Sequence, residues 1–524
     1  MFKPEIEIYD TTLRDGSQGL GINFSVADKL LIAKKLDDFG VQYIEGGWPG
    51  SNPKDIEFFK EAQKHTWKNA TLAAFGSTRK KNTRVEDDAQ VRLLLEADTP
   101  VVTIFGKTWL LHVTEVLGTT WGENLVMIGD TVRFLKSHGK FVIYDAEHAF
   151  DGYKDNPEYA TATWLAAQNA GADRLVLCDT NGGCLPNEIG TITEFITSCM
   201  EIKVGIHTHN DLGLAVSNAI SAVNSFAIQV QGTINGYGER TGNCNLITAV
   251  SCLQVKMGKR CVPEESIVRL VELARFVDNI ANMSHDPRQP VVGEGAFAHK
   301  GGVHLDAVRK VPSSYEHIDP AIVGNSRRVL MSDLSGKANV LLKATELGVE
   351  VKPDAPELKV VVEHIKSLEH FGYEFEGADG SFQLLLRKEL EHLIHPFFID
   401  SYNVSIRRDG GGERSVKVCD ANIQVSKRDV ELHTVARGDG PVNALDNALR
   451  KALTDLFPGI DRVHLVDYKV RILNVGSGSA SRTRVFITFA DGERQWTTVG
   501  ADDSIIEASL IALRDGYEYW LLCL

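Results

Sequence analysis

The chain lacks several features that would assign it to particular classes of protein. Its 524 residues include only eight cysteines, thinly spread and without a CxxC pair, so we expect no disulfide framework and a reduced, cytoplasmic location. No uninterrupted apolar run approaches the ~20 residues of a membrane span, and residues 1–5 hold no apolar signal core. The net charge of −14 argues against nucleic acid or an anionic membrane as a partner.

Eight short apolar runs, separated by stretches with helical spacing, make up the first half of the chain. The expected strands are 6–9, 43–46, 71–75, 101–105, 141–144, 174–178, 204–206 and 230–234. Eight such units within about 250 residues predict a (β/α)₈ barrel, which we assign to residues 1–274. A doubly wound open sheet is the alternative, but no GxGxxG follows the first expected strand.

Reactive side chains follow six of these eight strands. They lie in the segments 12–16, 45–47, 145–148, 179–183, 207–211 and 236–243. Catalytic groups of such barrels stand at the carboxyl ends of the strands. Six reactive strand ends that meet at one mouth therefore predict an enzyme with its active site there.

Two histidines, His207 and His209, are separated by one residue at the end of the seventh expected strand. Residues i and i+2 of a strand project to the same face, so both imidazoles are expected to point toward one position. With the carboxylate of Asp15 and the amide oxygen of Asn243 they make a mixed O/N set for a divalent metal. Such a set would accept Mg²⁺, Mn²⁺, Co²⁺ or Zn²⁺. Arg14 beside it can stabilise a negative charge that develops on a substrate oxygen.

Four motifs occur in the order found in a known enzyme family. They are TLRDGSQ (12–18), HTHNDLGLAVSN (207–218), GYGERTGN (236–243) and FAHKGGVH (297–304). Together they resemble the DRE-type TIM-barrel metallolyases, which include the 2-isopropylmalate, homocitrate and citramalate synthases. The resemblance covers nearly the whole chain. It implies the condensation of acetyl-CoA with an α-keto acid, followed by hydrolysis of the thioester.

The resemblance also implies roles for individual residues. Asp15, His207 and His209 would be metal ligands, with Asn243 as a fourth. Arg14 would contact the keto oxygen of the substrate and Thr180 its carboxylate. Glu147 corresponds to the family's base, and His304 with Tyr315 to an auxiliary pair beyond the barrel.

Two carboxylates compete for the role of base. Glu147 is expected to point into the mouth, and Asp145, two residues earlier, shares its face of the strand. A salt-bridged glutamate at a strand end is the alternative interpretation of Glu147. The sequence leaves open which of the two carboxylates removes the proton from the acetyl methyl.

The substrate is expected to be a small keto acid. Phe75 and Phe105, at the ends of the third and fourth expected strands, would form a tight apolar floor that favours pyruvate. The segments EGGWPGSNPKD and YDAEHAFDGYK also resemble a citramalate-forming subgroup, whose product leads to isoleucine. The alternatives are a 2-isopropylmalate synthase, a lyase or aldolase, and an inactive metal-binding sensor.

The negatively charged CoA would need a basic binding surface. The candidates are Arg79-Lys80-Lys81, Arg84 and Arg327-Arg328.

The remainder of the chain divides into two parts. Residues 275–385 are expected to form a linker and small helical subdomains, with a linker at 372–380. In residues 386–524, Thr434-Val435 and Ala448-Leu449 recur as Thr498-Val499 and Ala512-Leu513, at an offset of 64. The repeat predicts a pseudo-symmetric α+β module with a role in binding or assembly. The resemblance implies that this module joins a homodimer and mediates feedback inhibition, with isoleucine as the expected effector.

Overall fold

A computed structural model describes residues 3–299, 302–329, 337–349, 351–352, 355–391, 393–409, 416–473 and 481–523. The chain divides into two compact units. One consists of Met1–Phe297 with Ile318–Ser326, and the other of Ala298–His317 with Arg327–Leu524. Each unit has its own hydrophobic core.

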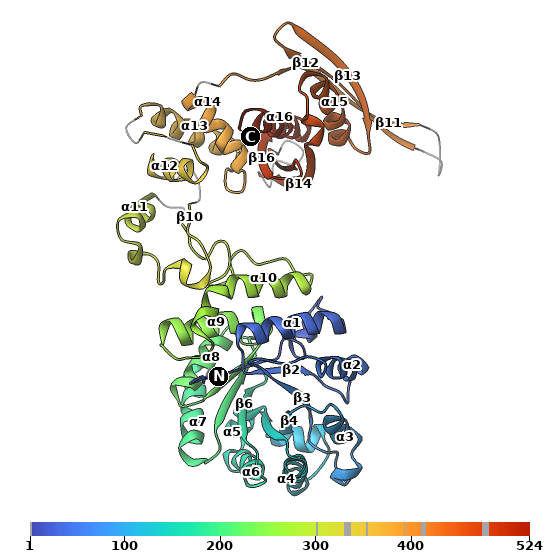
Figure 1. Ribbon diagram of the computed structural model, residues 1–524, viewed down its shortest axis with the longest axis vertical. Helices are drawn as coiled ribbons and strands as arrows, with labels where there is room; N and C mark the ends of the chain where they lie inside the picture. Colours follow the sequence, from blue (N-terminus) through green and yellow to red (C-terminus); the bar gives the residue numbers. More distant parts are fainter. Residues whose placement is uncertain are drawn as a thin grey trace. The chain divides into compact units, whose positions relative to one another are not determined.

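The first unit is a closed barrel of eight parallel strands, so the barrel prediction is confirmed and the open-sheet alternative is wrong (Figure 1). The strands are β1 (Glu7–Asp10), β2 (Tyr43–Gly47), β3 (Thr71–Ser77), β4 (Val101–Lys107), β5 (Phe141–Glu147), β6 (Arg174–Asp179), β7 (Val204–Thr208) and β8 (Gln229–Gly232). Each pairs with the next, and β8 closes the sheet against β1. Several strands run past their expected ends, which carries residues such as Lys107 and Glu147 to the rim of the barrel.

Helices surround the barrel and bury an apolar layer against it. They are α1 (Val26–Phe39), α2 (Pro53–Ala62), α3 (Ala89–Glu96), α4 (Trp121–Ser137), α5 (Ala149–Asp155), α6 (Pro157–Asn169), α7 (Pro186–Cys199), α8 (Ala215–Asn224), α9 (Leu246–Val250) and α10 (Leu270–Ile280). The local sequence sets their ends: Ser25 and Asp28 form a capping box at the start of α1, and Gly40 ends it in a left-handed conformation. In the described part of the chain no helix has the length and apolar character that a membrane crossing requires.

The first part of the second unit contains two short strands and four α-helices among its described residues. The short strands β9 (Ala298–His299) and β10 (Arg328–Val329) pair in parallel. The helices of this part are α11 (Gly302–Lys310), α12 (Lys337–Glu346), α13 (Glu357–Phe371) and α14 (Asp379–Glu391). The expected linker at 372–380 covers the connection between α13 and α14 and the first residues of α14, and Phe375 and Ala378 within it are buried in a core with Val361. Helix α14 runs continuously through position 385, the boundary predicted between the auxiliary subdomains and the C-terminal domain.

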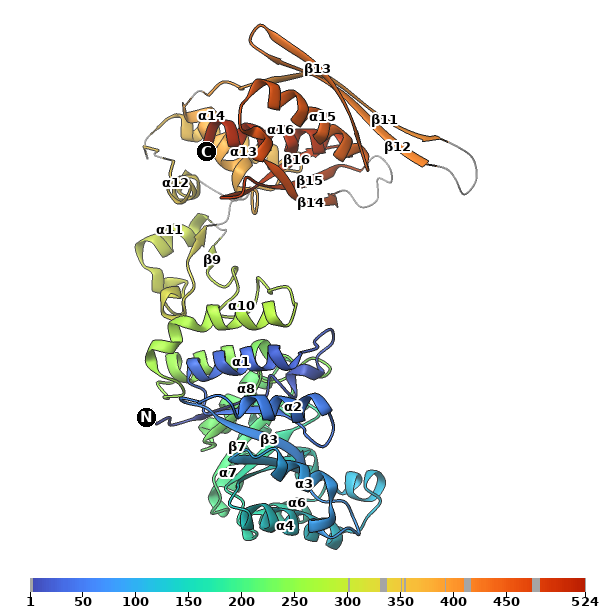
Figure 2. The ribbon, with the colours of Figure 1, turned by 45° about the vertical axis from the view of Figure 1, so that its right-hand side comes forward.

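The C-terminal repeat forms two copies of one α+β motif (Figure 2). The first copy consists of β11 (Phe398–Asp409), β12 (Val416–Lys427), β13 (Val430–Gly438) and α15 (Pro441–Leu456), and the second of β14 (His464–Ile472), β15 (Thr483–Ala490), β16 (Gln495–Asp502) and α16 (Ile505–Cys523). Both sheets are antiparallel. Equivalent hydrogen bonds connect the third strand of each copy to its helix. Thr434 Oγ1 donates to Ala448 O, and Thr498 Oγ1 donates to Ala512 O, each at 2.7 Å.

Candidate active site

The mouth of the barrel contains a pocket of about 200 Å³. Residues from all eight strand ends or the loops that follow them line it: Arg14, Asp15, Gln18, Trp48, Phe75, Phe105, Asp145, Glu147, Cys178, Thr180, His207, His209, Glu239 and Arg240. The mouth therefore brings together residues far apart in the sequence. Of the residues assigned to the site, only Asn243, His304 and Tyr315 lie outside this lining among the described residues.

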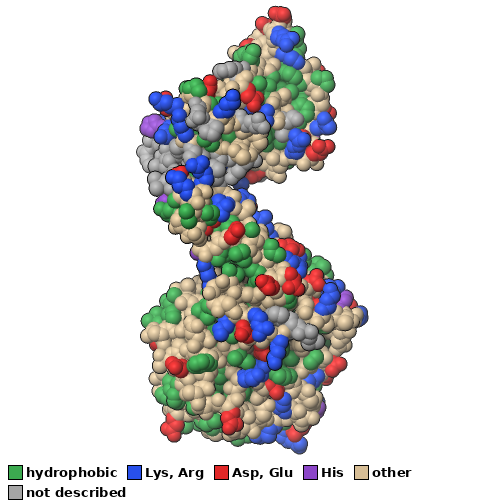
Figure 3. Space-filling view, turned by 60° about the vertical axis from the view of Figure 1, so that its left-hand side comes forward, with side chains coloured by type: hydrophobic (Ala, Val, Ile, Leu, Met, Phe, Trp, Pro, Cys, Tyr) green, Lys and Arg blue, Asp and Glu red, His purple; other side chains and the backbone are tan. Residues whose placement is uncertain are grey.

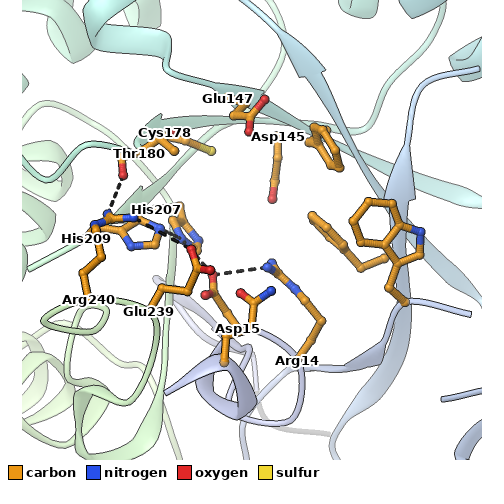
Figure 4. A pocket seen from close by; sticks show the side chains of 14 residues that line it. Arg14, Asp15, Asp145, Glu147, Cys178, Thr180, His207, His209, Glu239 and Arg240 are labelled. Carbon is orange, nitrogen blue, oxygen red and sulfur yellow. Dashed lines mark hydrogen bonds and ion pairs between the residues drawn. The ribbon is translucent and has the colours of Figure 1, made fainter. Parts of the chain in front are cut away.

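Asp15, His207 and His209 point toward one another (Figure 4). Each offers a ligand atom, and these atoms lie within 4.8 Å of one another. His207 Nε2 lies 3.4 Å from Asp15 Oδ2 and 3.3 Å from His209 Nε2. Two nitrogens bound to one ion at about 2.0–2.1 Å are separated by about 3.0–3.4 Å. The observed spacing of the two imidazoles fits a shared metal ion.

Asn243 lies next to His209 along the backbone, and its side-chain oxygen has no hydrogen-bond partner among the described residues. It pairs with His209 in an isolated antiparallel bridge, and its Nδ2 donates to Tyr237 O at 3.0 Å. Among the described residues, neither Asn243 Oδ1 nor His209 Nδ1 has a hydrogen-bond partner, although both atoms are buried. A Cβ at Gly238 would lie 2.1 Å from Asn243 Nδ2, so glycine is required for this close approach. An orphaned oxygen beside two imidazoles and a carboxylate fits a divalent cation.

The electrostatics of the cluster suit metal binding. Burial alone would raise the pKa of Asp15, but the Arg14 guanidinium and His207 hold it well below its usual range. Burial, together with the neighbouring His207, lowers the pKa of His209 to about 3. Burial acts to lower the pKa of His207, but the hydrogen bond with Asp15 and the charges of Asp15 and Asp145 together outweigh burial and raise it. At neutral pH Asp15 is therefore ionised and His209 neutral, which are their metal-binding forms.

Arg14 is held rigidly at the edge of the pocket. Its Nε donates to Glu45 Oε1 at 2.5 Å, and its guanidinium carbon lies 3.8 Å from the centre of the Phe75 ring. Glu45 is fully buried and also accepts from the hydroxyls of Tyr9 and Thr11, each at 2.6 Å. These contacts fix the direction in which the remaining guanidinium N–H groups point.

The two candidate bases on β5 differ in environment. Asp145 is buried and accepts from Gln231 Nε2 at 3.1 Å, and burial raises its pKa to about 7. Glu147 is nearer the rim, with 24% of its side chain exposed, and forms an ion pair with Lys107 of β4. The ion pair that was the alternative interpretation of Glu147 is therefore observed. Both Glu147 and Asp145 also line the pocket.

Thr180 presents a hydroxyl to the pocket. Its Oγ1 accepts from the backbone N–H of His148 at 2.8 Å, which leaves the hydroxyl proton free to donate elsewhere. His148 adopts φ +54°, a left-handed conformation uncommon outside glycine. Arg240 donates hydrogen bonds to the carboxylate of Asp211 and to the carbonyl of Thr180. These bonds connect the loop after β6, which contains Thr180, to the segment after β8.

Three aromatic rings form one wall of the pocket. Phe75 and Phe105 stack with centroids 5.6 Å apart, and Trp48 packs edge-on against both. The expected apolar floor of Phe75 and Phe105 is present and is enlarged by Trp48. The remaining space on this side suits a small apolar group.

The auxiliary pair is found in the second unit. His304 stacks on Tyr315 with ring centroids 4.4 Å apart. Within the FAHKGGVH segment, Lys300 and Gly301 lie outside the described residues. The contact between the two rings is established, and their part in a reaction stays a prediction.

Two of the basic residues expected to receive CoA on the barrel, Arg79 and Lys81, are already engaged, whereas Lys80 and Arg84 are exposed. Arg79 is buried and pairs with Glu123 and Asp130, and Lys81 donates to the carbonyls of Leu117 and Gly118. Figure 3 shows basic and acidic side chains interspersed over the visible face of the barrel. Arg79 is therefore wrong as a CoA contact, because its charge is already neutralised.

Among the residues of the site that were not singled out from the sequence, three make contacts that bear on its chemistry. They are Lys107, which pairs with Glu147; Trp48, which completes the aromatic wall; and Gln231, which contacts both His207 and Asp145. Lys107 lies at the carboxyl end of β4, a position that could have drawn notice. Gln231 lies within a strand, where a polar residue gives no sign of its partners.

Three family profiles match successive parts of the chain. The profile described as HMGL-like matches residues 5–277. The profile described as homocitrate synthase post-HMGL domain-like matches residues 291–372. The LeuA allosteric (dimerisation) domain matches residues 376–521, which include the repeat.

Curated relatives match along almost the entire chain. The (R)-citramalate synthase of Aquifex aeolicus is 52% identical over 521 residues, which is 99% of this chain and 98% of that protein. The (R)-citramalate synthase of Geobacter sulfurreducens is 47% identical over 516 residues, 98% and 97% of the two chains. A probable 2-isopropylmalate synthase of Methanopyrus kandleri is 30% identical over 530 residues, again 98% and 97%. The chain is thus markedly more similar to the two citramalate synthases than to the third relative.

Proposed function

Because the chain belongs to the family of the (R)-citramalate synthases, we propose that it condenses acetyl-CoA with pyruvate and hydrolyses the thioester with one water, yielding (R)-citramalate and CoA. The observation that carries this proposal is the buried cluster of Asp15, His207 and His209 beside Arg14 in the barrel mouth. A carboxylate, two imidazoles and a guanidinium in one pocket suit a reaction in which a keto oxygen gains negative charge.

Asp15, His207, His209 and Asn243 would hold the divalent ion. Their mixture of oxygen and nitrogen donors is compatible with Mg²⁺, Mn²⁺, Co²⁺ or Zn²⁺. When bound, such an ion supplies Lewis-acid polarisation of the keto carbonyl.

Three groups of the chain orient pyruvate. Arg14, fixed by Glu45 and Phe75, donates to the keto oxygen and stabilises the charge that it acquires. The Thr180 hydroxyl, whose oxygen already accepts from His148, donates to the carboxylate. The methyl group lies against the aromatic wall around Phe105, which leaves little room for a branched chain.

Glu147 is the better placed of the two candidate bases. Acetyl-CoA approaches from solvent, and Glu147 is the more exposed carboxylate, whereas Asp145 is only 3% exposed and engaged with Gln231. Glu147 takes a proton from the acetyl methyl, and the freed electron pair forms the bond to the keto carbon of pyruvate. The π pair of the keto group moves to its oxygen, beside Arg14, and a proton from solvent completes the hydroxyl. Lys107 would release Glu147 when the substrate arrives. His304 and Tyr315 assist as an auxiliary pair.

The C-terminal module serves assembly and regulation. Its match to a LeuA allosteric (dimerisation) domain supports a homodimer joined through the repeat and an amino-acid effector bound there. For an enzyme that forms citramalate, the effector is isoleucine. In the full chain, isoleucine should then lower the rate while leucine does not. Equal inhibition by both, or by neither, would contradict this assignment.

The release of free CoA thiol tests the proposed reaction. The full chain with Mn²⁺ and acetyl-CoA should release thiol when pyruvate is added and not in its absence. 2-Ketoisovalerate should give a lower kcat/KM than pyruvate. A preference for 2-ketoisovalerate would identify a 2-isopropylmalate synthase activity, and no release with either acid would contradict the proposed function.

A further inference from the structure

Directly beside the metal ligands, the barrel interior holds a glutamine that the proposed reaction does not use. Gln231 of β8 is the register partner of His207 on β7. Gln231 is only 1% exposed, so its amide must find its hydrogen bonds inside the barrel.

Both ends of this amide are engaged. Gln231 Nε2 donates to Asp145 Oδ1 at 3.1 Å, and Gln231 Oε1 lies 2.9 Å from His207 Nδ1. The NH₂ end of the amide therefore faces Asp145, whose Oδ1 is the acceptor of this hydrogen bond. The oxygen end is then left for His207, whose Nδ1 must carry a proton in order to donate.

The tautomer of His207 follows from this arrangement. When an ion displaces the Nε2 proton that pairs with Asp15, the proton that remains on the ring is the one on Nδ1, and Nε2, the atom that faces Asp15 and His209, offers its lone pair. If the amide turned over, its NH₂ group would face Nδ1, and the ring proton would move to Nε2, where the metal is expected. The amide of Gln231 therefore decides whether His207 can act as a ligand.

We propose that Gln231 is a positioning residue that selects the metal-binding tautomer of His207, and that Asp145 locks the orientation of its amide. The inference rests on the metal site of the proposed function. It also gives Asp145 a task apart from contact with substrate: Asp145 prevents the amide from turning.

Metal binding by the full chain without substrates provides the test. Gln231→Met keeps the approximate shape of the side chain and removes both hydrogen bonds. By calorimetric titration with Mn²⁺ alone, it should bind about 10–100-fold more weakly than the unaltered chain, as expected for loss of a ligand's hydrogen-bond partner. Gln229→Met is the matched control. Gln229 is also buried on β8, but its Nε2 donates to Glu7, away from the metal ligands. This control should bind Mn²⁺ as the unaltered chain does.

An exchange of the two polar groups makes the test specific. In the double variant Gln231→Glu with Asp145→Asn, the new carboxylate accepts from His207 Nδ1 and from the new amide, and the net charge is unchanged. This double variant should bind Mn²⁺ close to the level of the unaltered chain. Gln231→Met with Asp145→Asn should stay as weak as Gln231→Met alone, which shows that the rescue does not come from position 145.

The outcomes separate this inference from the proposed function. If the unaltered chain binds no Mn²⁺, the metal site itself is wrong. If the unaltered chain and Gln231→Met bind Mn²⁺ equally well, the site stands and the role of Gln231 is wrong. A double variant as weak as Gln231→Met would also overturn the inference. Unfolding temperatures measured on the same samples confirm that each variant is folded.

Discussion

The barrel mouth and the C-terminal repeat use buried polar groups in opposite ways. At the mouth, buried atoms of Asn243 and His209 lack partners among the described residues. In the repeat, Thr434 and Thr498 are buried and each donates to a carbonyl of the following helix. An unsatisfied buried polar atom costs about 1–3 kcal/mol. The mouth therefore keeps an arrangement that a ligand completes, whereas the two threonines of the repeat stabilise its own fold.

The comparison predicts that substitution of the metal ligands causes the largest loss of activity. His207→Ala or His209→Ala should abolish CoA release, because each removes a ligand, and the unfolding temperature should change little since both residues lie at the mouth. Chelation of the unaltered chain should have the same effect and be reversed by adding metal. Full activity after exhaustive chelation would contradict the metal-dependent account.

The next largest effect is expected at the base. Glu147→Gln keeps the shape and removes the proton acceptor, so kcat should fall by about 10²–10⁴-fold with little change in the affinity for pyruvate. Asp145→Asn is the comparison variant and should lose less. A variant at Glu147 with nearly full activity, together with an inactive variant at Asp145, would move the role of base to Asp145.

A smaller effect is expected at the aromatic wall. Phe105→Ala should enlarge the pocket and shift the ratio of kcat/KM values toward 2-ketoisovalerate by about tenfold or more, because one or two methylenes are worth about 1–3 kcal/mol. Phe105 is preferable to Phe75, whose ring carries the Arg14 guanidinium. An unchanged ratio would show that this wall does not select the substrate.

The smallest effect is expected in the repeat and concerns stability alone. Thr434→Val or Thr498→Val removes one buried hydrogen bond at nearly constant volume and should lower the free energy of unfolding of the module by about 1 kcal/mol. Turnover should be unchanged. Denaturant unfolding followed alongside the CoA assay measures both quantities, and a loss of turnover in the folded variants would break the division between the two regions.

The sequence predicts the fold of the barrel well, because its determinants are local. Eight apolar runs separated by helical spacing correspond to eight observed strands, and the spacing of His207 and His209 alone places both rings on one face. The repeat is likewise visible at a fixed offset and becomes two sheets, each followed by a helix.

The parts that the sequence could not supply depend on contacts between distant segments. Gln231 meets His207 through the register of two strands and Asp145 across the barrel, and no local pattern records either contact. Arg79 seemed free for CoA because its partners Glu123 and Asp130 come from a helix more than 40 residues later. Phe375 is buried although glycines and acidic residues around it are typical of a linker.

Equilibrium titration with Mn²⁺ tests most directly the claim that the mouth is built around a metal ion and the repeat is not. Three forms of the full chain are compared: the unaltered protein, His207→Ala and Thr434→Val. The account predicts one ion per chain for the unaltered protein and for Thr434→Val, and none for His207→Ala. An ion bound by His207→Ala with unchanged affinity and stoichiometry would contradict it.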